Sequence, residues 1–202
     1  MTASQFEEIW TSRYALTPPI SYLLRDAYPA RWFRIHTLPA SKRYPSNDSE
    51  WNIVLDRQNA LISDLLGNNF DVLVVTGEYD LNSSGKRKWT FSPVKALDQL
   101  IFIELQPVPL ETLNNERVHD EYKPNDTYRA VFSELYWQPS SWDRLLIAIG
   151  NDELSAFFIS ITNELIIAPY DGGVDIILKD EDTRNFYKAK YKDWLSDRED
   201  GL

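Results

Sequence analysis

Three short apolar segments near the C-terminus constrain the fold most, because only very short turns separate them. They are SAFFISI at 155–161, ELIIA at 164–168 and VDIIL at 174–178. The dipeptide Thr162-Asn163 separates the first two segments, and PYDGG separates the last two. Strands joined by such short turns pair antiparallel, since a parallel connection needs a crossover of about a dozen residues or more. We therefore expect an antiparallel sheet in this half of the chain.

Four earlier segments also read as strands. Side chains of residues 32–38 are expected to alternate between the two faces of a strand, with Trp32, Arg34 and His36 on one of them. FDVLVVTGEY (70–79) and LIFIELQPV (100–108) carry apolar runs that indicate central strands. TYRAVFSELYW, at 127–137, reads as a further strand.

Helical patterns occupy much of the remaining sequence. The segment from about residue 48 has a broad apolar face and ends at Gly67, a residue type common at helix C-termini. The other helices are expected at 3–14, 17–28 and 140–150 and from Asp180 onward. The pattern predicts a single α+β domain over residues 1–202. Its largely antiparallel, mixed sheet would have about six or seven strands, with about five helices packed on it.

Composition excludes several classes of protein. Of the 202 residues, 43% are hydrophobic and 13% aromatic, enough to form a core. The absence of cysteine excludes disulfides, thiolate nucleophiles and zinc sites with cysteine ligands. No apolar run approaches the roughly 20 residues of a membrane helix, and the N-terminus MTASQFEEIW is unlike a secretory leader. We therefore expect a cytoplasmic protein without membrane association.

The negative charge is concentrated in the second half of the chain. The formal net charge is -10. Residues 1–110 contain 11 Lys/Arg and 12 Asp/Glu, whereas residues 111–202 contain 10 and 19. Such a field repels nucleic-acid phosphates and attracts cationic proteins. The expected partner is a basic protein and not a nucleic acid, although solubility alone also accounts for the charge.

Few residues offer catalytic chemistry. The chain has two histidines, His36 and His119, and no HExxH, HxH or GxSxG motif. Glycine-rich phosphate loops are also missing, because Gly172-Gly173 is the only adjacent glycine pair. We therefore expect no metal and no cofactor, and we favour a non-enzymatic role while leaving catalysis open.

The densest group of positive charge lies in residues 25–43, where Asp26 is the only acidic residue. Arginine presents a planar donor fork that suits carboxylate and phosphate groups. Internal ion pairs with acids of the C-terminal half are the alternative explanation. The candidate anion site comprises Arg34, His36, Lys42, Arg43 and Arg57.

The turn around Gly172-Gly173 is a second candidate. Asp171 and Asp175 flank the pair and could bind a cation or take part in acid–base chemistry. The simpler interpretation is a strand-to-strand turn, with the aspartate bonded to local backbone and glycine adopting a positive φ.

Aromatic residues near acidic loops are the third candidate. Trp137 and Trp142, together with Asp171 and Asp175, are the residues we expect to contact a protein partner. Aromatic side chains surrounded by acids suit an electrostatically steered interface, although core packing explains them equally well. The neighbouring aromatic candidates are Trp89, Tyr122, Tyr128 and Tyr136.

Two segments resemble an uncharacterised family of small bacterial proteins. They are RIHTLPASKRYP and PYDGGVDIIL, the latter followed by YKAKYKDWLSDREDGL. The family has similar RIHxLPxSKRY and YDGGxDxIL…WLS segments. The C-terminal part is also similar to a broader bacterial domain of unknown function with a Y-D-x-x-G-x-D motif, which matches Gly173 and Asp175. The resemblance implies a bacterial cytoplasmic setting and brings no established activity.

Two functions remain open from the sequence. The first is a non-enzymatic inhibitor of the immunity or antitoxin type, which would bind a basic toxin enzyme. The second is a small-molecule or anion-binding module that uses the basic stretch with the acids of the DGGVD turn, and a hydrolase is one form that such a module could take. The sequence gives no oligomeric state.

Overall fold

The computed structural model describes residues 1–81, 95–113, 122–198 and 201. Five α-helices and eight strands lie within this part of the chain. The helices are α1 (Ala3–Arg13), α2 (Ser21–Ala27), α3 (Asp48–Leu66), α4 (Asp143–Gly150) and α5 (Glu181–Lys190). The strands are β1 (Trp32–His36), β2 (Asp71–Asp80), β3 (Ile103–Glu104), β4 (Val108–Pro109), β5 (Thr127–Tyr136), β6 (Ala156–Ser160), β7 (Leu165–Tyr170) and β8 (Gly173–Ile177).

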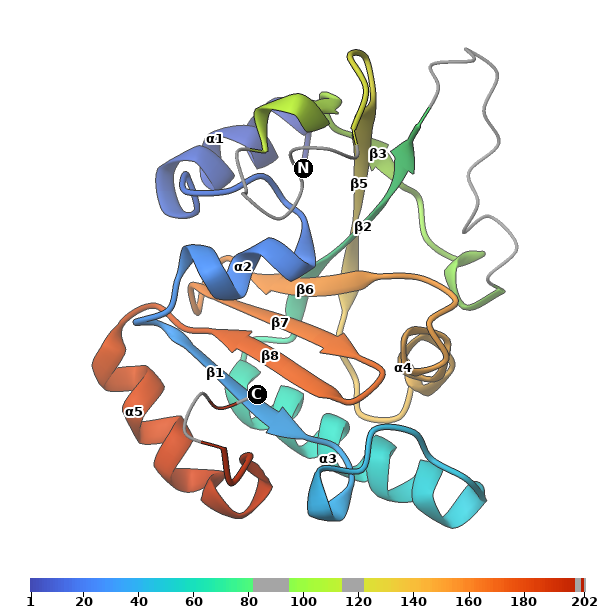
Figure 1. The fold of residues 1–202 in the computed structure, drawn as a ribbon, viewed down its shortest axis with the longest axis vertical. Coiled ribbons are helices and arrows are strands. Elements are labelled where there is room, and N and C mark those ends of the chain that lie inside the picture. The colour runs from blue at the N-terminus through green and yellow to red at the C-terminus, as the bar shows by residue number, and fades with distance from the viewer. Residues whose placement is uncertain (82–94, 114–121, 199–200, 202) are drawn as a thin grey trace.

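The described strands form one sheet in the order β1-β8-β7-β6-β2-β5-β3, and β4 also pairs with β5. Every pairing is antiparallel. The first strand of the chain lies beside the last, so that β1 and β8 bring the basic stretch next to the DGGVD turn (Figure 1).

Helices cover both faces of the sheet. Successive side chains of a strand point to opposite faces. In β2, Val74 packs into the core under α3 and α4, whereas Val75 packs into the core under α1 and α2. Figure 1 shows α2 in front of the sheet and α3 behind it. Both faces are therefore closed by apolar contacts, which explains the continuous apolar runs of β2 and β6.

The α+β class and the antiparallel hairpins are confirmed. β6 and β7 pair across Thr162-Asn163, and α5 follows its N-cap Asp180 directly. The described strands number eight instead of six or seven, because the single strand expected over 100–108 is replaced by two short strands, β3 and β4. No parallel pair occurs among these strands, so the mixed sheet that we expected is a purely antiparallel one here.

The expectation of a central strand over 100–108 is wrong. Within it only Ile103–Glu104 and Val108 pair, both with β5 alone, and β3 ends the strand order. Ile101 is 86% exposed, so the apolar run is not sandwiched between two helix layers. Hydrophobic runs alone do not separate a central strand from an irregular segment that covers one edge of a sheet.

Candidate functional site

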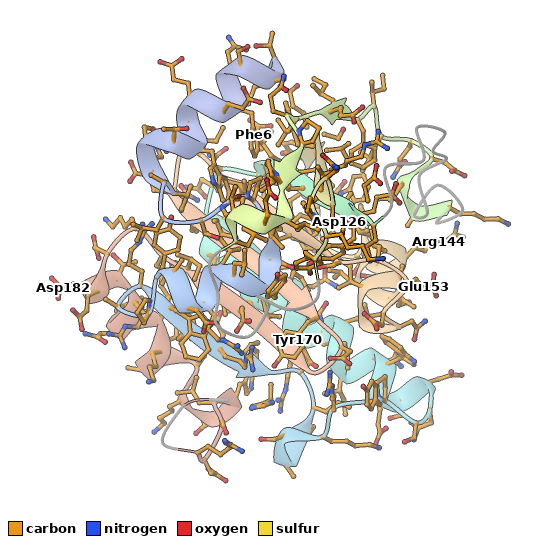
Figure 2. All side chains as sticks on the ribbon, turned by 45° about the horizontal axis from the view of Figure 1, so that its top comes forward. Phe6, Asp126, Arg144, Glu153, Tyr170 and Asp182 are labelled. Atoms are coloured by element: carbon orange, nitrogen blue, oxygen red, sulfur yellow. The ribbon has the colours of Figure 1, made fainter. Side chains whose placement is uncertain are left out.

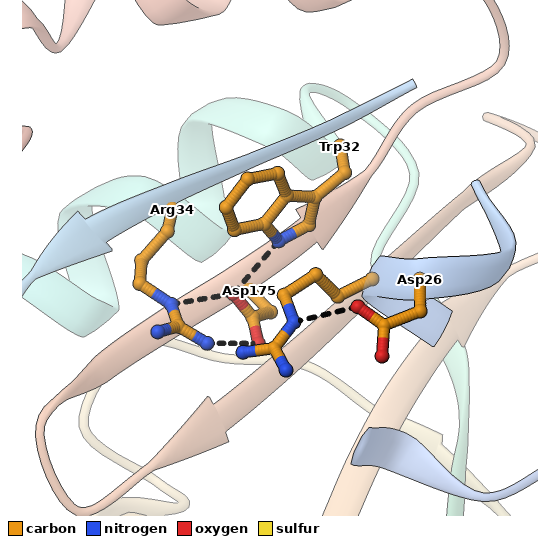
Figure 3. Close-up of polar contacts among 5 residues, drawn as sticks. Asp26, Trp32, Arg34 and Asp175 are labelled. Atoms are coloured by element: carbon orange, nitrogen blue, oxygen red, sulfur yellow. Dashed lines mark hydrogen bonds and ion pairs between the residues drawn. The ribbon is translucent and has the colours of Figure 1, made fainter. Parts of the chain in front are cut away.

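The site is built around an ion pair between the first and last strands. The register of β1 and β8 places Arg34 directly opposite Asp175. Arg34 donates from Nε and Nη2 to the two carboxylate oxygens of Asp175, at 2.7 and 2.8 Å. Trp32 donates its indole N–H to the same carboxylate at 2.8 Å (Figure 3). The alternation of β1 makes this possible, since Trp32 and Arg34 share one face of the strand.

Arg34 and Asp175 are nearly buried and electrostatically matched. Their side chains are 12% and 13% exposed. Burial acts to lower the pKa of Arg34, but the hydrogen bonds and charge of Asp175 outweigh it and raise that pKa. The guanidinium also lies 4.6 Å from the ring centre of Tyr170 and 5.7 Å from that of Trp32. These contacts hold Arg34 in place. We refer to Arg34, Asp175, Trp32 and Tyr170 together as the framework of the site.

The side chain of Tyr170 packs against Gly172 and Gly173 in the β7–β8 turn. It lies at the end of β7 (Figure 2), and burial raises the pKa of its hydroxyl to about 12. A Cβ on Gly173 would come within 2.1 Å of the Ile35 carbonyl oxygen and 2.9 Å of the Tyr170 hydroxyl. A Cβ on Gly172 would lie 3.0 Å from the Tyr170 ring. Glycine is therefore needed in this turn, because it lets the backbone of Ile35 and the side chain of Tyr170 approach closely.

The explanation of Gly172-Gly173 by a positive φ is wrong. The described glycines with positive φ are Gly67 and Gly201. The side chain of Asp171, moreover, accepts a hydrogen bond from Nε of Arg43 at 2.9 Å. The turn thus ties the loop after β1 to the β7–β8 hairpin through a second Arg–Asp pair.

These elements line a pocket of about 290 Å³, close to the lower end of the roughly 300–1,000 Å³ range of ligand pockets. One wall comes from α2, a second from the β7–β8 hairpin, and a third from the connection between α4 and β6. The polar lining residues are Ser21, Tyr22, Arg25, Arg34, Arg43, Asp152, Ser155, Tyr170, Asp171 and Asp175, and the apolar ones are Ile149, Leu154, Ala168 and Pro169.

Positive and negative groups are balanced in this pocket, with three arginines and three aspartates. Arg34 and Arg43 pair with Asp175 and Asp171, and Arg25 pairs with Asp26 next to it in sequence. The hydroxyls of Ser21 and Ser155 lie 2.8 Å apart and link α2 to the start of β6. Such a surface suits polar or charged ligands that carry more than one hydrogen-bonding group.

The candidate anion site is only partly assembled. Arg34 and Arg43 line the pocket, whereas His36, Lys42 and Arg57 do not. Lys42 binds Glu50 at 2.6 Å, within the loop and first turn that open α3. Arg57 donates to the carbonyl of His36 at 3.0 Å and lies 5.1 Å from the ring centre of Trp194. Internal pairing, the alternative considered from the sequence, accounts for most of the basic stretch.

His36 is half-buried beside this framework. Burial and the nearby charge of Arg34 lower its pKa, against the effect of a hydrogen bond with the backbone of Gly172. Its Nε2 is buried and has no hydrogen-bond partner in the described part of the chain. The neutral imidazole is therefore favoured at neutral pH.

The two tryptophans proposed as partner contacts belong to the core. Trp137 is 1% exposed and donates to Ser63 Oγ, and Trp142 is 9% exposed and donates to the carbonyl of Tyr136. Both therefore satisfy their indole N–H internally, and neither offers a surface for a partner. Of the neighbouring candidates, Tyr128 is buried and Tyr136 is 61% exposed. Trp89 and His119 lie outside the described residues.

Several pocket residues were not predicted as site residues. Arg25, Tyr22 and Ser21 lie on α2, and Asp152 and Ser155 lie between α4 and β6. No local motif connects these segments, because strand pairing and helix packing bring them together. A tyrosine directly before Asp-Gly-Gly was the one local signal, since glycines beside an aromatic residue permit close packing of a ring on the backbone.

In the residues that the structure describes, no group of three or more His, Asp or Glu side chains could hold a metal ion. The same part of the chain has no helix with the length and apolar character of a membrane span.

Comparison with known proteins gives one match. The family model "Domain of unknown function (DUF3885)" matches residues 20–199. Searches of curated proteins and of solved structures find no match. The matched range contains the whole pocket lining, from Ser21 to Asp175.

Proposed function

The chain belongs to this DUF3885 family, a domain of unknown function, and from its own geometry we propose a non-enzymatic module that binds a small polar molecule in the pocket between α2 and the β7–β8 turn. One observation carries the proposal. Three arginines and three aspartates from segments distant in sequence converge on a single pocket of about 290 Å³. Convergent polar groups in a concave site are what ligand binding requires.

The framework supports binding more directly than catalysis. Arg34 and Asp175 hold each other through two hydrogen bonds, and Trp32 and Tyr170 enclose the guanidinium. Groups locked in this way preorganise a pocket, because little freedom remains to be lost when a ligand enters. His36, the one described histidine, does not line the pocket. No other feature of the pocket points to a nucleophile with an adjacent base.

Thermal-shift screening tests this function. The panel contains phosphate, small carboxylates, amines, free amino acids and nucleotides, each at millimolar concentration. A ligand present at 100 times its Kd stabilises a protein by about 2.7 kcal/mol, which raises Tm by several degrees at this size. We expect at least one polar class to raise Tm, and Arg43→Gln to reduce that rise. A full panel without any shift would contradict the proposal.

A second candidate function is the inhibition of a basic protein, in the manner of an immunity protein or antitoxin. A separate groove supports it, lined by exposed Tyr136 together with Asp71 and Glu134 from β2 and β5. Glu134 already binds a cation there, the amino group of Met1, at 2.6 Å. An exposed tyrosine beside two carboxylates suits an arginine or lysine of a partner.

The second candidate is tested by capture of partners from a bacterial lysate at low and moderate salt. A basic enzyme should be retained at low salt and lost as the salt concentration rises. Tyr136→Ala with Glu134→Gln should abolish retention, whereas Asp182→Asn on α5 should not. Retention that is insensitive to the groove variants would exclude this surface.

The cellular setting is part of the proposal. A bacterial cytoplasm is supported by the family resemblance of RIHTLPASKRYP and PYDGGVDIIL and agrees with the lack of cysteine. Fractionation of a bacterium that encodes the chain would test this location.

A further inference from the structure

Two arginines that line the pocket have unused donors. In the described residues, Arg25 and Arg43 use Nε for their side-chain hydrogen bonds, with Asp26 and Asp171 as acceptors. The Nη groups of a guanidinium provide up to four further N–H donors. Arg25 is 27% exposed and Arg43 63% exposed, so both remain accessible to a ligand from solvent. A carboxylate is a natural acceptor for these donors.

The same pocket presents an acceptor of its own. Asp152 lies just after α4 and lines the pocket. The described part of the chain gives its exposed carboxylate no hydrogen bond or ion pair. Its backbone has a φ of 59°, which is in the left-handed region. Asparagine tolerates that region well, so the charge can be removed without changing the backbone. An ammonium group would satisfy this carboxylate.

The remaining charged residues of the lining are paired within the chain. Arg34 and Asp175 neutralise one another there and are nearly buried. Ile149, Leu154 and Ala168 add apolar surface. A ligand with one charge only would match either the arginine donors or the Asp152 carboxylate and leave the other unmatched. A ligand with both charges matches the balanced lining.

We propose that the ligand is a small zwitterion of the free amino-acid type, whose carboxylate binds Arg25 and Arg43 and whose ammonium group binds Asp152. This inference rests on the proposed small-molecule function and names its ligand class. The volume of about 290 Å³ is sufficient for a free amino acid. The apolar lining residues Ile149, Leu154 and Ala168 offer a surface for a short aliphatic side chain.

Matched ligands test the inference by isothermal titration calorimetry and ¹H–¹⁵N NMR. The probes are leucine, serine and glutamine, each compared with its deamino carboxylic acid and its decarboxylated amine. The expected result is that at least one amino acid binds 10-fold or more tightly than both of its single-charge analogues. It should also shift backbone signals around residue 152 and the β7–β8 turn.

Variants separate the two charges of the ligand. Asp152→Asn should weaken amino-acid binding at least 10-fold and leave the affinity for the carboxylate analogue unchanged. Arg43→Gln should weaken both. The control is Asp182→Asn, because Asp182 is an exposed carboxylate on α5 and lies far from Tyr170 in Figure 2.

Two negative outcomes are distinguishable. Binding of phosphate or of a carboxylate analogue as tightly as the amino acid would overturn the zwitterion inference and leave the small-molecule function standing. Failure of every amino acid, carboxylate, amine, phosphate and nucleotide tested to bind the folded chain would overturn both.

Discussion

Asp175 is the residue on which the site depends most. It accepts hydrogen bonds from Trp32 and Arg34 across the β1–β8 pairing. The alternation of residues 32–36 correctly predicts that Trp32 and Arg34 share a face. Their partner lies 141 positions further along the chain than Arg34, and no local pattern encodes that register. The sequence therefore indicated internal pairing as a class but not which acid would pair.

Removing the charge of Asp175 should destabilise the fold. Asp175→Asn leaves a guanidinium that is 12% exposed without its counter-ion, and breaking a buried pair in this way typically costs about 3–5 kcal/mol. Adding Arg34→Met should recover part of the loss, because no unpaired charge remains. Urea unfolding measures both variants.

The control for this prediction is Lys190→Met, which breaks the more exposed pair with Asp64. Exposed pairs contribute at most about 1 kcal/mol. Equal losses in Lys190→Met and Asp175→Asn would contradict a special role for the β1–β8 pair.

His36 should make stability depend on pH. Its pKa is lowered in the folded chain, first by burial and then by the charge of Arg34. As the pH falls through the ordinary value of 6.5, the unfolded chain takes up the proton before the native chain does, so the native state loses stability until the lowered pKa is reached. His36→Gln should remove this component. Parallel stability profiles of the two proteins between pH 7.5 and pH 5 would refute the effect.

At the scale of elements, the β7–β8 hairpin depends on close approach of backbones. The Asp-Gly-Gly sequence correctly predicts a turn between two strands. It does not reveal why two glycines are needed, because the contacts come from Tyr170, Arg43 and the neighbouring strand β1. The same limit applies to 100–108, where pairing with β5 and not the local apolar run determines the structure.

Two alanine substitutions distinguish the roles of the glycines. Gly173→Ala would place a methyl group 2.1 Å from the backbone oxygen of Ile35, and overpacking of this kind typically costs about 1–3 kcal/mol or more. Gly172→Ala meets flexible side chains at 3.0 and 3.2 Å, so we expect a smaller loss. Chemical denaturation ranks the pair, and the reverse order would contradict the register of β1 on β8.

At the scale of the whole molecule, two cores share one sheet. The alternation in β2 and β6 joins the layer of α1 and α2 to the layer of α3 and α4 through the same strands. The class and the hairpins follow from local pattern. The strand order does not, because the pairing of β1 with β8 and the packing of α2 over the pocket are long-range events. This is why the sequence offered Arg34, Arg43, Asp171 and Asp175 as candidates but did not place Arg25 and Asp152 in the same pocket.

A single domain should unfold in one transition. Phe6→Ala on the α1 face and Leu61→Ala on the α3 face each create a cavity in a different core, with expected losses of about 3–5 and 2–5 kcal/mol. Both should shift the same cooperative transition, seen identically by circular dichroism and tryptophan fluorescence. Separate transitions for the two probes would show that the two cores unfold as independent units, which would contradict the single domain.

The measurement that tests the binding pocket most directly is arginine side-chain NMR during titration with leucine, acetate and phosphate. The account predicts that the guanidinium signals of Arg25 and Arg43 move in a saturable manner with at least one of these probes, while the Nε signal of Arg34 remains in place because Asp175 holds it. Saturable binding whose shifts lie away from this pocket, or no shift of Arg25 and Arg43 with any probe, would contradict the assignment of the site.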